Sequence, residues 1–221
     1  MERRSRLERL APLTGMLAVA LIVAAFVVFP DEVPETDKSV AEIAKFWRDH
    51  DDEASISAVL LALSAIPMTW FAGSVRRVLD RAEGGRGRLA AIAFAGLVIY
   101  SVGALVGGAL QFAAGESADQ ISPAAIETLN AITVNFWFPY IAGIAIFMLA
   151  TGVASLRHRA LHPALGWTAL ALGILGITPL GFFAFLASGL WILAASVVLY
   201  LRDDADAPAA PAAPAAPPPP S

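Results

Sequence analysis

The residues best suited to chemistry are few in this chain of 221 residues. His158 and His162 are four positions apart, which would place both on one side of a helix, as a metal pair requires. They stand beside Arg157 and Arg159, with no nearby carboxylate to complete a site. The chain contains no cysteine, which removes thiolate ligands and disulfides. We therefore expect no metal site here, and a basic surface patch instead.

Acid–base residues are also missing from the long apolar stretches, which contain no Asp, Glu, Lys, Arg or His. A haem-binding bundle needs histidines inside its helices, and ion-coupled transport or intramembrane proteolysis needs ionisable groups at depth. We expect no catalytic residue, no cofactor and no enzymatic activity. Sodium sites built from carbonyls and hydroxyls, and chemistry on carboxylates outside the membrane, stay open as alternatives.

Neutral polar side chains lie midway along two of the apolar stretches. Tyr100 is next to Ser101, and Trp191 follows Ser188 by three positions. Trp and Tyr normally gather at membrane interfaces, so their presence at mid-depth points to an intramembrane pocket for a small ligand. The alternative is that these groups bond neighbouring helices and fill core space.

The elements that would hold these residues are six apolar stretches, which predict an all-α, polytopic transmembrane bundle. A bilayer-spanning helix needs about 20 apolar residues. The final stretch is too long for one helix, and Thr178-Pro179-Leu180-Gly181 divides it with turn-forming residues. The predicted spans are residues 11–30, 56–75, 89–112, 132–155, 165–178 and 182–201.

Two of these spans are interrupted by a proline in their interior. Pro67 and Pro139 each remove one backbone donor from a helix interior, so we expect kinks at both positions. Such kinks serve as hinges in some transporters, and they are also common structural features of membrane helices.

The basic residues are sorted between the two sides of the membrane. Six spans put both termini on one side, and the positive-inside rule makes that side cytoplasmic. The other side carries only Lys38, Lys45 and Arg48 among the basic residues. We expect a bacterial cell-membrane protein whose cytoplasmic surface contacts anionic lipid headgroups. The arginines predicted to make these contacts are Arg76, Arg77, Arg81, Arg86, Arg88, Arg157 and Arg159.

The first outer loop carries nine acidic residues between Asp31 and Glu53. Ser39 and Glu42 have the spacing of a capping box, and apolar residues recur after them at helical spacing. We expect a short amphipathic helix lying at the outer interface, with Phe46 and Trp47 at headgroup level. In the second outer loop, Ser122 followed by a proline predicts another helix start.

The C-terminal residues 203–221 are rich in alanine and proline. This composition predicts a disordered cytoplasmic tail. We expect membrane lipids as partners and no nucleic acid. A protein partner could bind the acidic outer loop or this tail.

The chain resembles a group of uncharacterised integral membrane proteins of actinobacteria. The resemblance covers residues 10–202, and its motifs mark helix boundaries and helix packing. It implies a six-helix membrane fold, but no activity and no functional residues. The segments that carry it are Leu-Ala-Pro-Leu-Thr-Gly at 10–15, Ala-Glu-Ile at 41–43, Ser-Ala-Val-Leu-Leu-Ala-Leu at 57–63, Leu-Gly-Trp at 165–167 and Ile-Thr-Pro-Leu-Gly at 177–181.

Two functions are therefore expected from the sequence. The first is a non-enzymatic envelope or interaction protein that acts through its outer loop, its lipid contacts or its tail. The alternative is a carrier or binding protein for a small apolar or neutral solute. A cavity that reaches Tyr100 and Trp191 would favour the carrier, whereas close packing at both would argue against it.

Overall fold

The computed structural model describes residues 10–29 and 33–205, with side chains up to Arg202. Helices joined by short turns and loops make up these residues, with no strand among them, which confirms the all-α prediction. The helices are η1 (Ala11–Leu13), α2 (Thr14–Val28), α3 (Val40–Asp49), α4 (Asp51–Ala82), α5 (Arg88–Glu116), α6 (Pro123–Asn135), α7 (Phe138–His158), α8 (Pro163–Gly176) and α9 (Gly181–Ala205).

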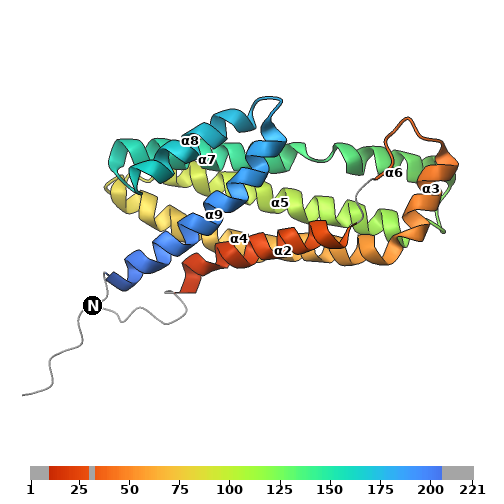
Figure 1. Ribbon diagram of the computed structural model, residues 1–221, viewed down its shortest axis with the longest axis horizontal. Helices are drawn as coiled ribbons and strands as arrows, with labels where there is room; N and C mark the ends of the chain where they lie inside the picture. The colour runs from red at the N-terminus through yellow and green to blue at the C-terminus, as the bar shows by residue number, and fades with distance from the viewer. Residues whose placement is uncertain (1–9, 30–32, 206–221) are drawn as a thin grey trace, which may run out of the picture.

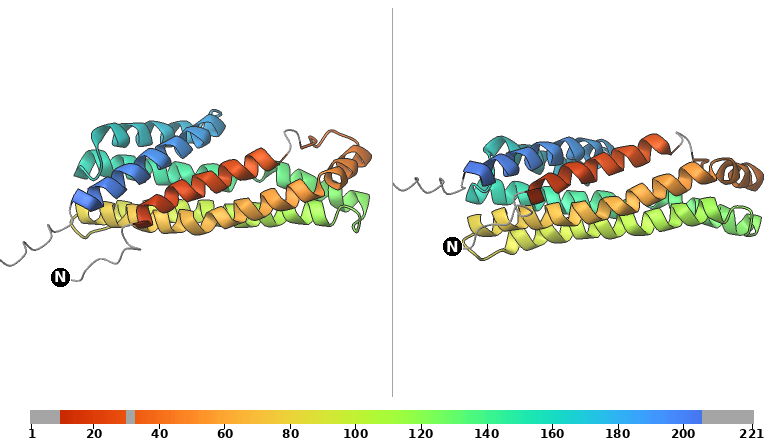
Figure 2. Two further views of the ribbon diagram at one scale, coloured as in Figure 1. Left: turned by 60° about the horizontal axis from the view of Figure 1, so that its bottom comes forward. Right: turned by 90° about the horizontal axis from the view of Figure 1, so that it is seen from below.

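The long helices form an elongated bundle in which α4, α5 and α7 lie side by side (Figures 1 and 2). Helix α2 packs on α4, while α8 and α9 pack on the other side of α7. The short helices α3 and α6 lie together at one end of the bundle (Figure 1). The opposite end holds the α4–α5 and α7–α8 turns and the end of α9.

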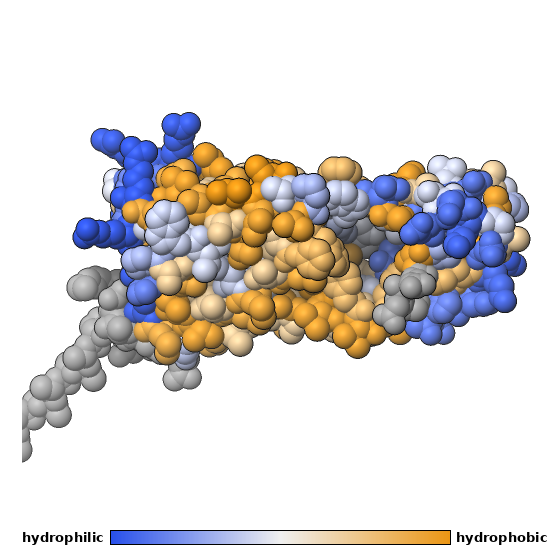
Figure 3. Space-filling model, turned by 45° about the horizontal axis from the view of Figure 1, so that its top comes forward, coloured by the Kyte–Doolittle hydropathy of each residue, from blue (hydrophilic) through white to orange (hydrophobic). Residues whose placement is uncertain are grey.

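The surface has the pattern expected of a membrane protein, with an apolar belt between two hydrophilic ends (Figure 3). Five segments are long and apolar enough to cross a bilayer: Ala11–Val28, Asp51–Ala82, Arg88–Glu116, Pro123–His158 and Gly181–Arg202. Helix α8 has 14 residues, about 21 Å at the usual helical rise, against a hydrocarbon thickness of about 30 Å. It is thus the one predicted span that falls short of the crossing length.

The first outer loop forms the predicted helix but in a different place. Helix α3 begins with the expected capping box between Ser39 and Glu42. Its Trp47 is fully buried against α6 and the outer ends of α4 and α5, so the expectation that Trp47 lies at headgroup level is wrong. The indole N–H of Trp47 donates to the Asn130 side-chain oxygen at 3.0 Å, and the Asn130 amide donates to the Pro34 carbonyl at 3.0 Å.

Helices α3 and α6, with the chain from Val33 to Ser39, therefore form one folded unit, called the outer cap below. Ser122 does occupy the position before α6, with Pro123 in the first turn, but its side chain makes no capping hydrogen bond.

The two prolines have different positions. Pro67 lies inside the continuous helix α4, as predicted. Pro139 does not kink a continuous span, because the chain turns at Phe136 and Trp137 and Pro139 falls in the first turn of α7. A proline costs nothing there, since the N–H groups of a first helical turn have no partner within the helix.

Candidate functional site: a groove between α2 and α9

A groove opens between α2 and α9, the first and last long helices. Near the bundle end that carries the arginines, Gly15 faces the Ser196 hydroxyl so closely that a methyl group on Gly15 would not fit. One turn further along α2 the contact is looser, because a Cβ atom on Gly189 would lie 3.9 Å from Val19. Beyond this point the two helices separate and leave a lower cavity of about 180 Å³.

The lower cavity is apolar and opens towards the lipid. Its floor includes Met68 and Tyr100, which are almost fully buried. Its rim includes Phe26 of α2 and Leu186 and Leu190 of α9, which are exposed. In a bilayer this rim would face acyl chains, so the lower cavity is accessible from the membrane rather than from water.

A second, upper cavity of about 230 Å³ lies closer to the outer cap. Both cavities are lined by Phe26, Tyr100 and Phe185, so they are neighbours, and together they are called the α2–α9 groove below. Only the upper cavity has several polar side chains in its wall: Gln111, Thr133 and Tyr140 as well as Tyr100. Among the described residues, none that lines either cavity carries a charge.

Tyr100 stands where the two cavities meet. Its ring stacks on Phe185, with centroids 6.2 Å apart, and meets the Tyr140 ring edge-on at 5.8 Å. The Tyr100 hydroxyl is buried without a hydrogen-bond partner among the described residues. The neighbouring Ser64 hydroxyl donates to the Leu61 carbonyl at 2.6 Å. This hydroxyl is enclosed and lies beside the Ser64 oxygen, and since an unpaired hydroxyl is costly to bury, a hydrogen bond from a ligand that reached it would be favourable.

The other residues predicted for the pocket are placed differently. Ser188 lines the lower cavity, but its hydroxyl already donates to the Ala184 carbonyl at 2.7 Å. Ser101 donates to Leu97 at 2.8 Å and lines neither cavity. Trp191 is packed edge-on against Phe147, and its N–H donates to the Leu165 carbonyl at 3.0 Å.

The structure thus joins Tyr100 and Ser188 at the groove and leaves Ser101 and Trp191 in packed surroundings.

Sequence reasoning missed several residues of the groove. Phe185 and Gln111 line it, yet one is an ordinary apolar residue within a span and the other sits near a helix end. Tyr140, which directly follows Pro139, was also not among the residues predicted to line the pocket. Its hydroxyl lies against Gly107, where a methyl group would collide with it. That contact depends on how α5 and α7 cross, which no local pattern reveals.

The arginines expected to meet lipid headgroups share one end of the bundle, and their side chains are exposed: Arg76, Arg77, Arg81, Arg86, Arg88, Arg157 and Arg159. The turn between α4 and α5, which carries Arg86, is held by Glu83, whose carboxylate accepts the N–H groups of Leu89 and Ala90 at 3.0 and 2.7 Å. Binding to anionic headgroups remains a prediction, and the exposure of these side chains is what it requires.

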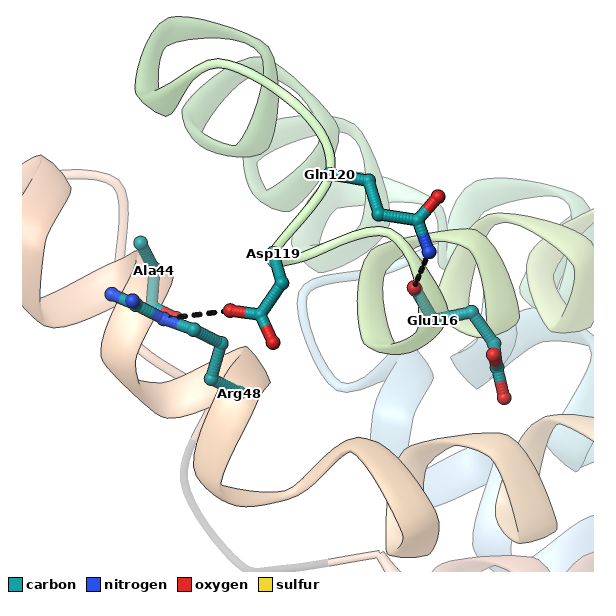
Figure 4. A network of polar contacts seen from close by, with 5 residues as sticks. All are labelled: Ala44, Arg48, Glu116, Asp119 and Gln120. Atoms are coloured by element: carbon teal, nitrogen blue, oxygen red, sulfur yellow. Dashed lines mark hydrogen bonds and ion pairs between the residues drawn. The ribbon is translucent and has the colours of Figure 1, made fainter.

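The outer cap presents mostly acidic groups at the other end. Within the described part of the chain, the ion pair joins Arg48 of α3 to Asp119 in the loop after α5, with Nε and Oδ1 3.7 Å apart (Figure 4). Both side chains are largely exposed, so the pair contributes little to stability. Arg48 also donates to the Ala44 carbonyl at 3.0 Å, and Gln120 donates to the Glu116 carbonyl at 3.3 Å.

No group of His, Asp and Glu suited to a metal ion occurs among the residues that the structure describes. Comparisons of the chain with protein-family models, with curated proteins and with solved structures give no match.

Proposed function

We propose that this protein is a multi-pass protein of the bacterial cell membrane that binds a small apolar or neutral molecule in the α2–α9 groove. The observation that carries the proposal is the meeting of two apolar cavities at Tyr100, whose buried hydroxyl has no partner. Ligand sites are concave and mostly apolar, with a few polar groups that fix orientation. The groove has this character. The protein is non-enzymatic in this proposal.

The proposed orientation has both termini in the cytoplasm. It is supported by the grouping of exposed arginines at one end of the bundle and of exposed carboxylates at the other. In that orientation the outer cap lies outside the cell and the groove opens to the outer half of the membrane.

Native mass spectrometry of the protein, extracted gently from its own membranes, tests the binding function. The wild-type chain should carry a discrete adduct. Tyr100→Phe should weaken it about tenfold, because one hydrogen bond to the ligand is worth about 1.4 kcal/mol. The matched control is Tyr200→Phe, which makes the same change on α9 outside both cavities. Bare protein, or the same ladder of phospholipids in all three samples, would refute the proposal.

A second candidate function rests on the outer cap, which could serve as a docking platform for another envelope protein. Its support is that α3 and α6 are held together by the buried Trp47–Asn130 hydrogen bond while exposed acidic side chains surround them. Cross-linking in intact cells, from cysteines introduced at Lys45 and Glu127, would capture such a partner. Cross-links from Ile92, on the lipid-facing side of α5, provide the control, and equal products from all three sites would exclude docking.

A further inference from the structure

Helix α8 is too short to cross a bilayer, so in the proposed orientation the hairpin between α8 and α9 turns at membrane depth. Helix α8 starts at Pro163, next to the exposed arginines of the cytoplasmic end. Its 14 residues reach about 21 Å into a hydrocarbon layer about 30 Å thick. Figures 1 and 2 show the turn ending short of the outer end of α2 in every view. The tip of the hairpin therefore lies at the depth of the outer leaflet.

The hydrogen bonds and side chains at the tip are suited to contact with lipid. The Thr178 hydroxyl donates to the Leu175 carbonyl at 2.7 Å and accepts the N–H of Leu180 at 3.2 Å. The N–H of Gly181 donates to the Thr178 carbonyl at 2.9 Å. Turn backbone within hydrocarbon must satisfy its polar groups internally, and these bonds do so. The side chain of Ile177 at the tip is 72% exposed and apolar.

The α2–α9 groove starts at this tip and runs inwards. The residues of α9 that line it extend from Phe182 to Leu193, a length of about 17 Å along the helix. One leaflet of the hydrocarbon layer is about 15 Å deep. The groove therefore has the depth of one leaflet, which is also the reach of one lipid chain. Its two volumes, about 180 and 230 Å³, have Tyr100 in common in their walls.

Polarity changes along the groove in the same direction as in a lipid leaflet. Gln111 and Thr133 lie only in the upper cavity, at the outer end, and the lower cavity ends at apolar residues such as Ile192. Gln111 and Thr133 already donate to the Ala54 and Leu129 carbonyls, so they provide a polar wall through their oxygens. A lipid chain with its ester groups uppermost matches this order. The absence of charge in the lining, among the described residues, leaves the charged headgroup outside the groove.

We propose that the α2–α9 groove holds one acyl chain of a phospholipid from the outer leaflet, which enters over the tip of the α8–α9 hairpin. This inference rests on the proposed binding function and specifies its ligand. The proposed binding mode also explains why α8 is short. A hairpin long enough to cross the bilayer would extend past the outer end of the groove and separate the groove from the outer leaflet.

Photolabelling of the full-length protein in vesicles tests the inference. The vesicles contain phosphatidylglycerol and phosphatidylethanolamine, with a small fraction of phosphatidylcholine that carries a diazirine at the end of one acyl chain. The probe is added either to the leaflet facing the outer cap or to the opposite one. We expect label on α9 and α2 within the groove, at least fivefold more from the cap-side leaflet than from the other.

Two variants show whether the label reports the groove. Gly189→Leu places a side chain where α2 and α9 separate, and it should reduce labelling of the groove at least fivefold. Gly73→Leu is the matched control, because a Cβ atom at Gly73 has nothing within 4 Å, and its labelling should equal that of the wild type. A thermal melt of each variant confirms that the fold is kept.

The outcomes separate this inference from the function on which it rests. Equal labelling in both glycine variants, or equal labelling from both leaflets, would overturn the acyl-chain inference. If a non-lipid adduct sensitive to Tyr100→Phe were present at the same time, the binding function would stand with another ligand. Absence of both the adduct and the label would reject both proposals.

Discussion

Gly96 of α5 and Gly143 of α7 face each other across the centre of the bundle, each against the other's backbone. A Cβ atom on either glycine would lie 2.7 Å from the carbonyl oxygen of the other. Lipid supplies no hydrophobic drive between helices, so close backbone contact of this kind holds membrane bundles together. The contact fixes how α5 and α7 cross, and thereby where Tyr100 and Tyr140 stand.

Gly96→Ala should destabilise the bundle by about 1–3 kcal/mol, because the added methyl group meets the α7 backbone at Gly143 and Phe147, which cannot yield locally. Gly73→Ala is the control on α4, where the space is open, and it should be neutral or slightly stabilising through its better helix propensity. Unfolding in mixed detergent micelles, followed by circular dichroism, measures both. Equal free energies of unfolding for the two variants would show that α5 and α7 can move apart without loss of stability.

Tyr100→Phe should raise the stability of the ligand-free protein by about 1 kcal/mol. The substitution removes a buried hydroxyl that lacks a partner and leaves the ring in its stack with Phe185, and burying such a group costs free energy. The same variant should bind ligand less well. A loss of stability without ligand would mean that the hydroxyl has a partner in the folded protein.

Gly107→Ala should reduce ligand binding more than stability. The new methyl group would occupy the position of the Tyr140 hydroxyl and push that ring into the upper cavity, which Tyr140 lines. Adding Tyr140→Phe to this variant relieves the closest contact and should restore part of the binding. The adduct fraction in native mass spectra of the single and double variants measures this, and no recovery would argue against the steric explanation.

Asn130→Ala should loosen the outer cap without affecting the bundle. It leaves the buried Trp47 N–H without its acceptor, at a cost of about 1–3 kcal/mol, and it frees the Pro34 carbonyl. Asn135→Ala is the control on the same helix, since Asn135 is exposed and bonds only within α6. Hydrogen exchange of residues 40–49 should accelerate in the first variant alone, and unchanged exchange would contradict the role given to Asn130.

The start of α3 should weaken in acid. The Ser39 hydroxyl and backbone N–H both donate to the Glu42 carboxylate, at 2.7 and 3.0 Å, and they lower its pKa below the usual 4.5. Because the folded pKa is the lower one, this stabilisation is fully present above the unfolded pKa and is lost as the pH falls through the folded pKa. Exchange protection of α3, corrected for intrinsic rates, should fall over that range in the wild type but not in Glu42→Gln.

The features that the sequence predicted correctly are those governed by neighbours along the chain. Ser39 and Glu42 signal the start of α3 because both partners of the capping box lie within four residues. The turn at Thr178 to Gly181 was likewise predicted from residues adjacent in the chain, and the apolar stretches predicted the long helices.

The features that the sequence did not predict depend on contacts between distant segments. Trp47 was expected among lipid headgroups. Nothing in the sequence around Asn130 marks it as the hydrogen-bond partner of a distant indole. Trp191 looked like Tyr100 in the sequence, as an aromatic residue at mid-depth. The two differ only because the Leu165 carbonyl of α8 lies within reach of one indole. The groove was not predicted either, since it arises from the angle between α2 and α9.

The Trp47–Asn130 bond also sets an order for biogenesis. Its partners are 83 residues apart, and the spans formed by α4 and α5 lie between them in the chain. In the proposed orientation, Trp47 reaches the far side of the membrane first as the ribosome delivers the protein, and it faces water until Asn130 has been translocated. Closure of the outer cap thus reports that insertion has proceeded through α6. A chain stalled before that point would expose an aromatic surface that quality-control proteases can recognise.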